Sequence, residues 1–177
     1  MALLTVVATA SAAAAQGLDE RAAAAERRAD DAIALCATAD DLPPDARLPV
    51  LARGLVIAES AVELSEHSAR AHYAIVCNLG KAIGLSGVGL GTWRAVSRLR
   101  REIEATLALA PDDPEALAAK GALLVKLPRW LGGDRGEAER WLRRALAMDP
   151  TNATARAYLE QLGAGPHVAP AADIVVR

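Results

Sequence analysis

The sequence is poor in aromatic residues, which make up 3% of its 177 positions, and it has no phenylalanine. Hydrophobic residues still account for 53% of the chain, and much of that fraction is alanine. Alanine loses no side-chain entropy in a helix and lets two helix backbones approach closely. No segment alternates convincingly between apolar and polar residues, as a half-buried strand would. The composition therefore predicts an all-α fold with closely packed helices.

Excess charge and the common catalytic motifs are also missing. The formal net charge is −2, with Lys and Arg interspersed among Asp and Glu, so the chain lacks the basic face that nucleic-acid binding requires. It contains no GxSxG, HExxH or CxxC motif and no Walker-type phosphate loop. The glycine-rich stretch 84–91 follows a predicted helix rather than a strand, which argues against phosphate binding. We therefore expect a protein that is not an enzyme and that holds no cofactor or metal.

Cysteine is scarce: only Cys36 and Cys77 are present, and both fall on predicted helices. In an oxidising compartment the two are able to form a disulfide. Lone cysteines on helices also serve as small core residues, and the sequence leaves both alternatives open. The three histidines, His67, His72 and His167, show no metal-ligand spacing with either cysteine.

The first 15 residues have the features of a secretory signal peptide. An apolar run from Leu3 to Ala8 is followed by small residues, and Ala13 and Ala15 suit the narrow pockets of a signal peptidase. We expect cleavage after Ala15 and a periplasmic or secreted chain with no membrane-inserted segment after signal removal. No Lys or Arg precedes the apolar run, which departs from the pattern. The alternative is a plain alanine-rich N-terminal helix.

Helical periodicity, capping residues and prolines divide the rest of the chain into seven predicted helices. They are expected at about 18–39, 45–64, 68–83, 92–109, 115–126, 135–148 and 153–163. Ser68 and Asp134 are expected to act as helix N-caps, and the glycines of 84–91 are expected to interrupt the chain between two helices. The tail 164–177 has no clear periodicity and is expected to be an irregular extension.

Two segments of the sequence align with each other: LALAPDDPEALAAKGALL and LAMDPTNATARAYLEQL. In each, a helix ends just before a proline and a new alanine-rich helix begins about two residues later. The pattern resembles the tetratricopeptide repeat, a helix–turn–helix unit of about 34 residues. The positions that match the repeat are Ala116, Gly121, Ala138, Leu142, Ala145, Pro150 and Ala155. Pro111 and Pro150 are 39 residues apart, and Glu66, which stands where the preceding proline is expected, lies 45 residues before Pro111. The array is therefore divergent, with two widened turns.

The resemblance implies a short right-handed solenoid of about seven helices over residues 16–163, in which stacked helix pairs form one continuous core. A narrower resemblance covers Ala69 to Leu162 and rests mainly on the turn LPRWLGGD and the following AERWLRRALAMDP. This segment is similar to bacterial periplasmic tetratricopeptide-like proteins of the TRAP-transporter-associated T-component type. It implies an accessory protein that meets a solute-binding partner or its ligand. Within the turn, Trp130 is expected either to fold back onto the core or to be an exposed contact residue.

The first helix of each pair in such a scaffold lines the concave surface, where a ligand is expected. The candidate groove residues are Arg70, Tyr73 and Lys81 on the helix 68–83, and Glu115 and Lys126 on the helix 115–126. Lys81 and Lys126 occupy equivalent repeat positions, and with Arg70 they are suited to hold a carboxylate or an acidic peptide end. Alternatively, both lysines extend into solvent from helix ends.

The sequence therefore predicts a non-enzymatic scaffold or adaptor that binds a protein, a peptide or a small anionic ligand in the periplasm. The alternative function is a structural module that self-associates through exposed apolar helix faces. A large apolar patch on outer helices would favour assembly, and a deep cationic groove would favour ligand capture.

Overall fold

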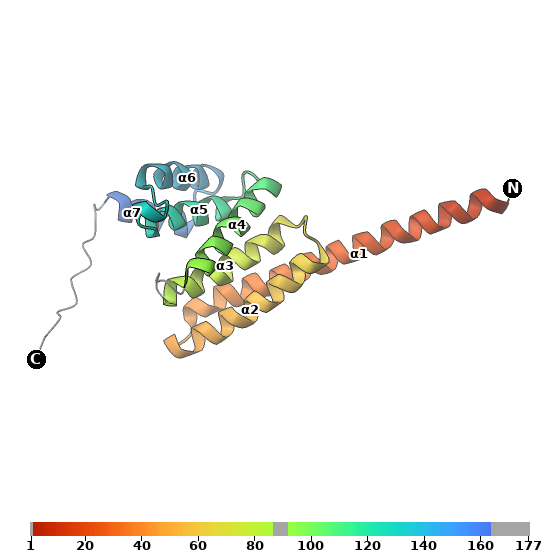
Figure 1. Ribbon diagram of the computed structural model, residues 1–177, viewed down its shortest axis with the longest axis horizontal. Helices are drawn as coiled ribbons and strands as arrows, with labels where there is room; N and C mark the ends of the chain where they lie inside the picture. Colours follow the sequence, from red (N-terminus) through yellow and green to blue (C-terminus); the bar gives the residue numbers. More distant parts are fainter. Residues whose placement is uncertain (1, 87–91, 164–177) are drawn as a thin grey trace, which may run out of the picture. The chain divides into compact units, whose positions relative to one another are not determined.

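The computed structural model describes residues 2–86 and 92–163, with side chains described from residue 15 onward. Its α-helices are α1 (Ala2–Thr38), α2 (Pro44–Leu64), α3 (Ala69–Ser86), α4 (Trp93–Leu109), α5 (Pro114–Lys126), α6 (Arg135–Met148) and α7 (Ala153–Gly163) (Figure 1). Short 3₁₀ turns follow α1 at Ala39–Asp41 and α5 at Arg129–Leu131. No strand occurs within these ranges, and the predicted all-α fold is confirmed.

The expected helix bounds agree with the observed ones to within a few residues, except at two places. Helix α1 is continuous from Ala2, so the apolar segment 2–15 has the same helical backbone as the part that follows it. Helix α3 continues to Ser86, so it extends past its expected end at about 83 and into the glycine-rich stretch 84–91. The remainder of that stretch, 87–91, and the predicted tail 164–177 lie outside the described residues.

The chain divides into two compact units, Met1–Pro111 and Asp112–Arg177. In the first unit, α1 packs against α2 and α3, α2 packs against α3, and α3 packs against α4. In the second unit, α5 packs against α6 and α7, and α6 packs against α7. The first three helices of each unit therefore follow one contact pattern. The stacking of all helices into a single solenoid stays a prediction.

Helices α3, α5 and α7 begin with the same kind of N-cap hydrogen bond. Ser68, Asp113 and Asn152 each accept a hydrogen bond from the backbone N–H of the alanine three residues later, at 3.0, 2.7 and 2.8 Å. These alanines, Ala71, Ala116 and Ala155, are all completely buried, and they are spaced by 45 and 39 residues. The predicted cap at Ser68 is confirmed. The two spacings are those that separate Glu66, Pro111 and Pro150 in the sequence.

The helices that precede these caps also end alike. Ala61 in α2, Thr106 in α4 and Ala145 in α6 are completely buried, again 45 and 39 residues apart. Each backbone carbonyl accepts a hydrogen bond from the N–H four residues later, which closes the last turn of its helix. Helix ends thus recur in register along the chain.

Small residues let the paired helices approach closely. A Cβ atom at Gly121 of α5 would lie 2.5 Å from Cγ of Leu142 in α6 and 3.1 Å from the carbonyl oxygen of Ala138. Gly121, one of the positions that match the repeat, is therefore a point of close contact between α5 and α6. Ala138 and Leu142 are themselves completely buried, so the core of this unit depends on close packing rather than on large side chains.

Candidate functional site

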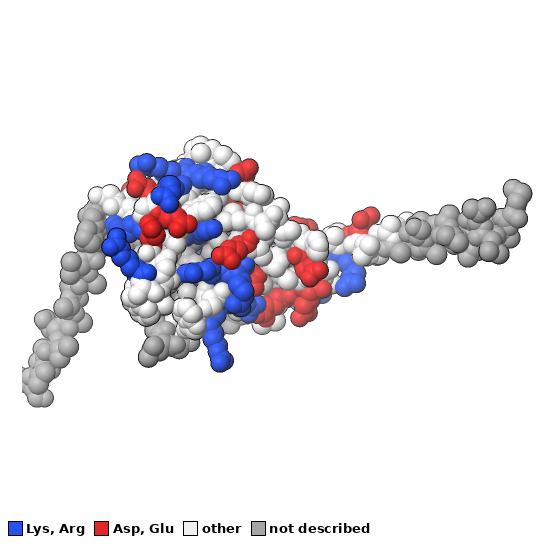
Figure 2. Space-filling view, turned by 45° about the horizontal axis from the view of Figure 1, so that its top comes forward, with Lys and Arg blue, Asp and Glu red and all other residues white. Residues whose placement is uncertain are grey.

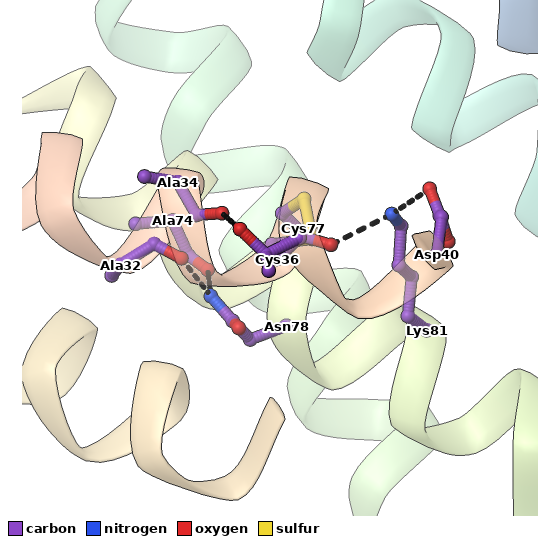
Figure 3. The surroundings of a disulfide bond; sticks show 9 residues. Ala32, Ala34, Cys36, Asp40, Ala74, Cys77, Asn78 and Lys81 are labelled. Carbon is purple, nitrogen blue, oxygen red and sulfur yellow. Dashed lines mark hydrogen bonds and ion pairs between the residues drawn. A yellow bond between two sulfur atoms is a disulfide. The ribbon is translucent and has the colours of Figure 1, made fainter. Parts of the chain in front are cut away.

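Two of the predicted groove cations, Arg70 and Lys81, contact α1 within their own unit. The Arg70 guanidinium pairs with the carboxylate of Asp30. The Lys81 ammonium donates to the Cys36 carbonyl oxygen at 2.8 Å and to Asp40 Oδ2 at 2.5 Å (Figure 3). Both side chains therefore join α3 to α1, and neither is an isolated charge that awaits an anionic ligand.

The other predicted groove residues lie on α3 and α5. Tyr73 is half-buried on α3. Glu115 is exposed in the first turn of α5, and Lys126 is exposed at its end, where its Nζ lies 5.9 Å from the centre of the Tyr158 ring. Three of the five residues belong to the first unit and two to the second. A common groove that contains all of them stays a prediction.

Cys36 and Cys77 form a disulfide that links α1 to α3 (Figure 3). Their Cα atoms are 6.0 Å apart, and 41 residues separate them in the sequence. Of the two alternatives that the sequence left open, pairing is the one observed. Cys36 is completely buried, whereas Cys77 is half-buried. Such a cross-link restricts the unfolded chain and stabilises the first unit.

Asn78 follows the disulfide and is completely buried among α1, α2 and α3. Its Nδ2 donates to the carbonyl oxygens of Ala32 and Ala74, at 2.9 Å each (Figure 3). Its Oδ1 has no hydrogen-bond partner among the described residues and faces Gly54, where an added Cβ would lie 2.1 Å away. No room for a ligand is left at this contact, so Asn78 acts in helix packing.

A polar network joins α2, α3 and α4 in the first unit. His72 Nδ1 lies 2.7 Å from Glu102 Oε2, and His72 Nε2 lies 3.0 Å from the backbone oxygen of Glu66. Arg98 donates to Glu59 at 2.6 Å and lies 3.7 Å from Glu102. A backbone oxygen only accepts hydrogen bonds, so Nε2 must carry a proton. With Glu102 ionised, Nδ1 carries one too, and the ring is an imidazolium.

The pKa values of the pair agree with this geometry. The hydrogen bond to Glu102 raises the pKa of His72 above its ordinary value, against the opposing effect of burial. Burial alone would raise the pKa of Glu102, but the hydrogen bond and charge of His72, together with Arg98, lower it below its ordinary value. Both ring nitrogens of His72 are engaged, so the pair is better suited to joining helices than to proton transfer. Sequence reasoning missed this network, because its members come from three helices.

An open groove of about 720 Å³ lies between α1 and the end of α2. It is lined by Leu18, Asp19, Arg21, Ala22 and residues 62–67. Carboxylates, a guanidinium, an imidazole and apolar side chains all contribute to the lining, so no single ligand class is indicated. Within the described ranges, no group of three or more His, Cys, Asp or Glu residues is placed to hold a metal ion.

The turn between α5 and α6, residues 127–134, presents an aromatic side chain to solvent. Trp130 is 79% exposed, the highest value among the large apolar residues of the described chain. Of the two roles expected for Trp130, the fold-back onto the core is wrong and the exposed position is observed. The predicted cap is confirmed, because the Asp134 side chain accepts a hydrogen bond from Glu137 N–H at 2.8 Å.

The molecular surface offers no large area of one charge on the face drawn in Figure 2, where basic and acidic side chains are interspersed. No helix in the part of the chain that the structure describes is both long and apolar enough to cross a membrane. No protein-family model matches the chain, and no curated protein is similar enough to count as a match.

Proposed function

We propose that this chain is a non-enzymatic helical-repeat adaptor of an oxidising compartment such as the periplasm, and that it binds a protein or peptide. The observation that carries the binding role is the exposed Trp130 on a hydrogen-bonded turn between two paired helices. Tryptophan is among the residues most enriched at binding hot spots. Solvent exposure of a large apolar side chain has no benefit for the stability of the isolated chain.

The recurrence of caps and helix ends supports a repeat architecture. Buried alanines follow the caps of α3, α5 and α7, and buried small residues end α2, α4 and α6, with the same spacings of 45 and 39 residues. Such units stack through nearest-neighbour contacts and expose broad surfaces for partners. Insertions in repeats map to loops on one face, which is often the binding face. The α5–α6 turn is an insertion of this kind.

The disulfide supports the proposed compartment. Disulfides form and persist in secreted and periplasmic proteins and are rare in a reducing cytosol. The predicted signal segment 1–15 is consistent with the same route. Purification of the chain from its native host, followed by N-terminal sequencing and thiol titration, tests both points. A first residue of Gln16 and no free thiol are the expected results; an intact Met1 with two free thiols would overturn the proposed compartment.

The experiment that tests partner binding is a quantitative pull-down from periplasmic extract with three versions of the full chain. They are the wild type, Trp130→Ala, and Trp93→Ala as a matched control. Trp93 is 56% exposed and lies in the other unit, so its loss changes aromatic exposure without changing the turn. We expect a protein that is retained by the wild type and by Trp93→Ala and lost with Trp130→Ala. Equal retention by all three would contradict the role of Trp130.

Self-assembly is a second candidate function, favoured by one observation. Leu48 and Val56 lie eight residues apart on α2 and are 43% and 65% exposed, so they share one outward face of that helix. If assembly is the function, the mass in solution should rise with concentration and fall back to that of a monomer in Leu48→Ser/Val56→Ser. Light scattering over a concentration series measures this directly.

A further inference from the structure

The α5–α6 turn is locked by its own backbone. The N–H groups of Leu131 and Gly133 both donate to the Pro128 carbonyl, at 2.9 and 3.1 Å, and Gly132 N–H donates to Arg129 at 3.0 Å. Gly132 has φ 86°, a left-handed conformation that favours glycine. The turn is therefore held in a single shape before any partner arrives, which lowers the entropic cost of binding.

Gly133 adds a second constraint on the same turn. A Cβ atom at Gly133 would lie 1.8 Å from the carbonyl oxygen of Leu127, and this backbone atom has no freedom to move away. Leu127 is 5% exposed and anchors the start of the turn in the core. The chain thus buries one side of the turn tightly while Trp130 on the same turn stays in solvent.

Two arginines near the turn have side chains without partners. The guanidinium groups of Arg129 and Arg140 form no hydrogen bond or ion pair with another described residue. The pKa of Asp134 is lowered mainly by the hydrogen bond that its carboxylate accepts from Glu137 N–H. The charges of Arg140 and Arg129 lower this pKa further, so both arginines lie near Asp134. Asp134 is already used as a helix cap, so it does not pair with either guanidinium.

The remaining charges near the turn have partners of their own. Arg135 donates to the carbonyl oxygen of Leu162 at 3.3 Å, and Glu137 accepts from the Trp141 ring N–H at 3.0 Å. Residues 129–140 contain three arginines and three carboxylates, and Glu139 pairs with Arg143 at 2.7 Å. Arg129 and Arg140 are therefore the charged residues of this segment whose side chains keep no hydrogen-bond or ion-pair partner among the described residues, and the planar guanidinium of arginine suits bidentate binding of carboxylates.

We propose that the α5–α6 turn binds an acidic segment of another protein, with Trp130 packed on an apolar side chain of that segment and Arg129 and Arg140 paired with its carboxylates. The proposal rests on the adaptor function proposed above and names the chemistry of the partner. Arginine and tryptophan together are the residue types most enriched at interface hot spots. A protein segment is favoured over a membrane surface, because a single aromatic side chain on a rigid turn offers too little apolar area for insertion.

Fluorescence anisotropy tests the proposal with a synthetic probe. The probe is a fluorescein-labelled peptide in which pairs of glutamates alternate with single leucines, and its control has lysine in place of every glutamate. We expect the full-length wild type to bind the acidic peptide and not the basic one. Affinity should fall at least about tenfold in Trp130→Ala and in Arg129→Glu/Arg140→Glu, as for hot-spot residues, and should weaken with added salt.

A matched variant separates a local effect from a change in overall charge. Arg53→Glu/Arg143→Glu makes the same charge change on α2 and α6, at exposed positions outside the turn. It should bind the acidic peptide as the wild type does. Equal losses in both double variants would overturn a specific site at the turn. Thermal unfolding of each variant shows whether it is folded, and Arg129→Gln/Arg140→Gln gives a second test without negative charge at these positions.

The remaining outcomes distinguish this inference from the adaptor function. If the acidic peptide does not bind but Trp130→Ala still loses its partner in the pull-down, the acidic chemistry is wrong and the adaptor function stands. If neither experiment depends on Trp130, both proposals fail. Binding to vesicles of phosphatidylglycerol in preference to the acidic peptide would overturn a protein partner in favour of an anionic membrane surface.

Discussion

The helix pair α3–α4 of the first unit and the pair α5–α6 of the second carry different side chains at positions related by the spacings of the helix caps. His72 of α3 lies 45 residues before Leu117 of α5, and Glu102 of α4 lies 39 residues before Trp141 of α6, which are the spacings of the helix caps. In the first unit, His72 and Glu102 form a hydrogen-bonded ion pair. In the second unit, the corresponding residues are the completely buried Leu117 and Trp141, whose ring centre lies 4.2 Å from Lys120 Nζ.

A helix pair of this type therefore accommodates either polar or apolar side chains between its helices, while both pairs keep small buried residues at the helix ends. The first unit also carries a disulfide, a buried amide, and ion pairs that join α3 to α1 and to the 3₁₀ turn that follows α1. The second unit contains no cysteine. Its stability depends on close helix contacts and on caps. The two units should therefore respond differently to reduction, to substitution of glycine and to pH.

Removal of the disulfide should give the largest difference between the units. Cys36→Ala/Cys77→Ala opens a loop of 41 residues, which should lower the free energy of unfolding of the first unit by about 4 kcal/mol. Hydrogen exchange followed by mass spectrometry resolves the units: exchange should speed up in α1 to α4 and stay unchanged in α5 to α7. Equal acceleration in α5 to α7 would show that the second unit depends on the first.

Substitution of the glycines at the helix contacts should have the next largest effect on stability, and the size of the loss should differ between the two units. Gly54→Ala places a methyl group against the Asn78 amide, which is buried and bonded to two carbonyls, so we expect a loss of about 3 kcal/mol. Gly121→Ala meets the apolar side chain of Leu142, which makes no hydrogen bonds that a shift would break, so its cost should be smaller, about 2 kcal/mol. Urea unfolding of both variants measures the difference.

A double-mutant cycle tests the cause of the Gly54 effect. Addition of Asn78→Ala should restore much of the stability lost in Gly54→Ala, because the smaller side chain removes the clash. Without such rescue, overpacking against the amide would not be the explanation. Leu142→Ala should likewise relieve Gly121→Ala, although the cavity it leaves has a cost of its own.

Caps should have a smaller effect, and here too the units differ. Asp113→Ala removes one capping bond of α5 and should cost about 1 kcal/mol. Ser68→Ala should cost more, because Ser68 Oγ both caps α3 and donates to Glu26 of α1 at 2.6 Å. Thermal unfolding of the two variants shows which substitution lowers stability more. A smaller loss for Ser68→Ala would mean that its bond to α1 adds nothing to stability.

The smallest expected effect is a pH dependence near neutral pH, which should be confined to the first unit. The pKa of His72 is raised above 6.5, so its contribution to stability is complete below 6.5 and is lost as the pH rises through the raised value. The pKa of Glu102 is lowered, so its contribution is complete above its ordinary value and is lost only in more acidic solution. The first unit should therefore be most stable in mildly acidic solution.

Replacement of the pair by apolar residues should remove this dependence. His72→Leu/Glu102→Leu copies the chemistry found in the second unit, and such exchanges of buried ion pairs are often neutral or stabilising. The stability of α1 to α4, followed by hydrogen exchange between pH 5 and pH 8, should then change with pH no more than that of α5 to α7. A slope that persists in the double variant would point to other titrating groups.

The sequence predicted those features that depend on neighbours along the chain. Prolines, periodicity and capping residues such as Ser68 and Asp134 placed the seven helices, because helix ends are decided locally. Interactions between helices were harder to predict. The ion pair of His72 with Glu102 and the packing of Asn78 on Gly54 join residues that only the tertiary fold brings together. For the same reason, Lys81 could be placed on its helix but its contacts with Asp40 and Cys36 could not be foreseen.

The fit between Gly54 and Asn78 has a consequence for how this sequence can change over generations. Because the glycine faces the amide at a distance that no Cβ tolerates, any side chain at position 54 is acceptable only after position 78 has become smaller. An asparagine that shrinks first leaves a small cavity but no clash, so that order of substitution is open while the reverse order is closed. Positions 54 and 78 should therefore vary together among descendants of this chain, with the change at 78 coming first.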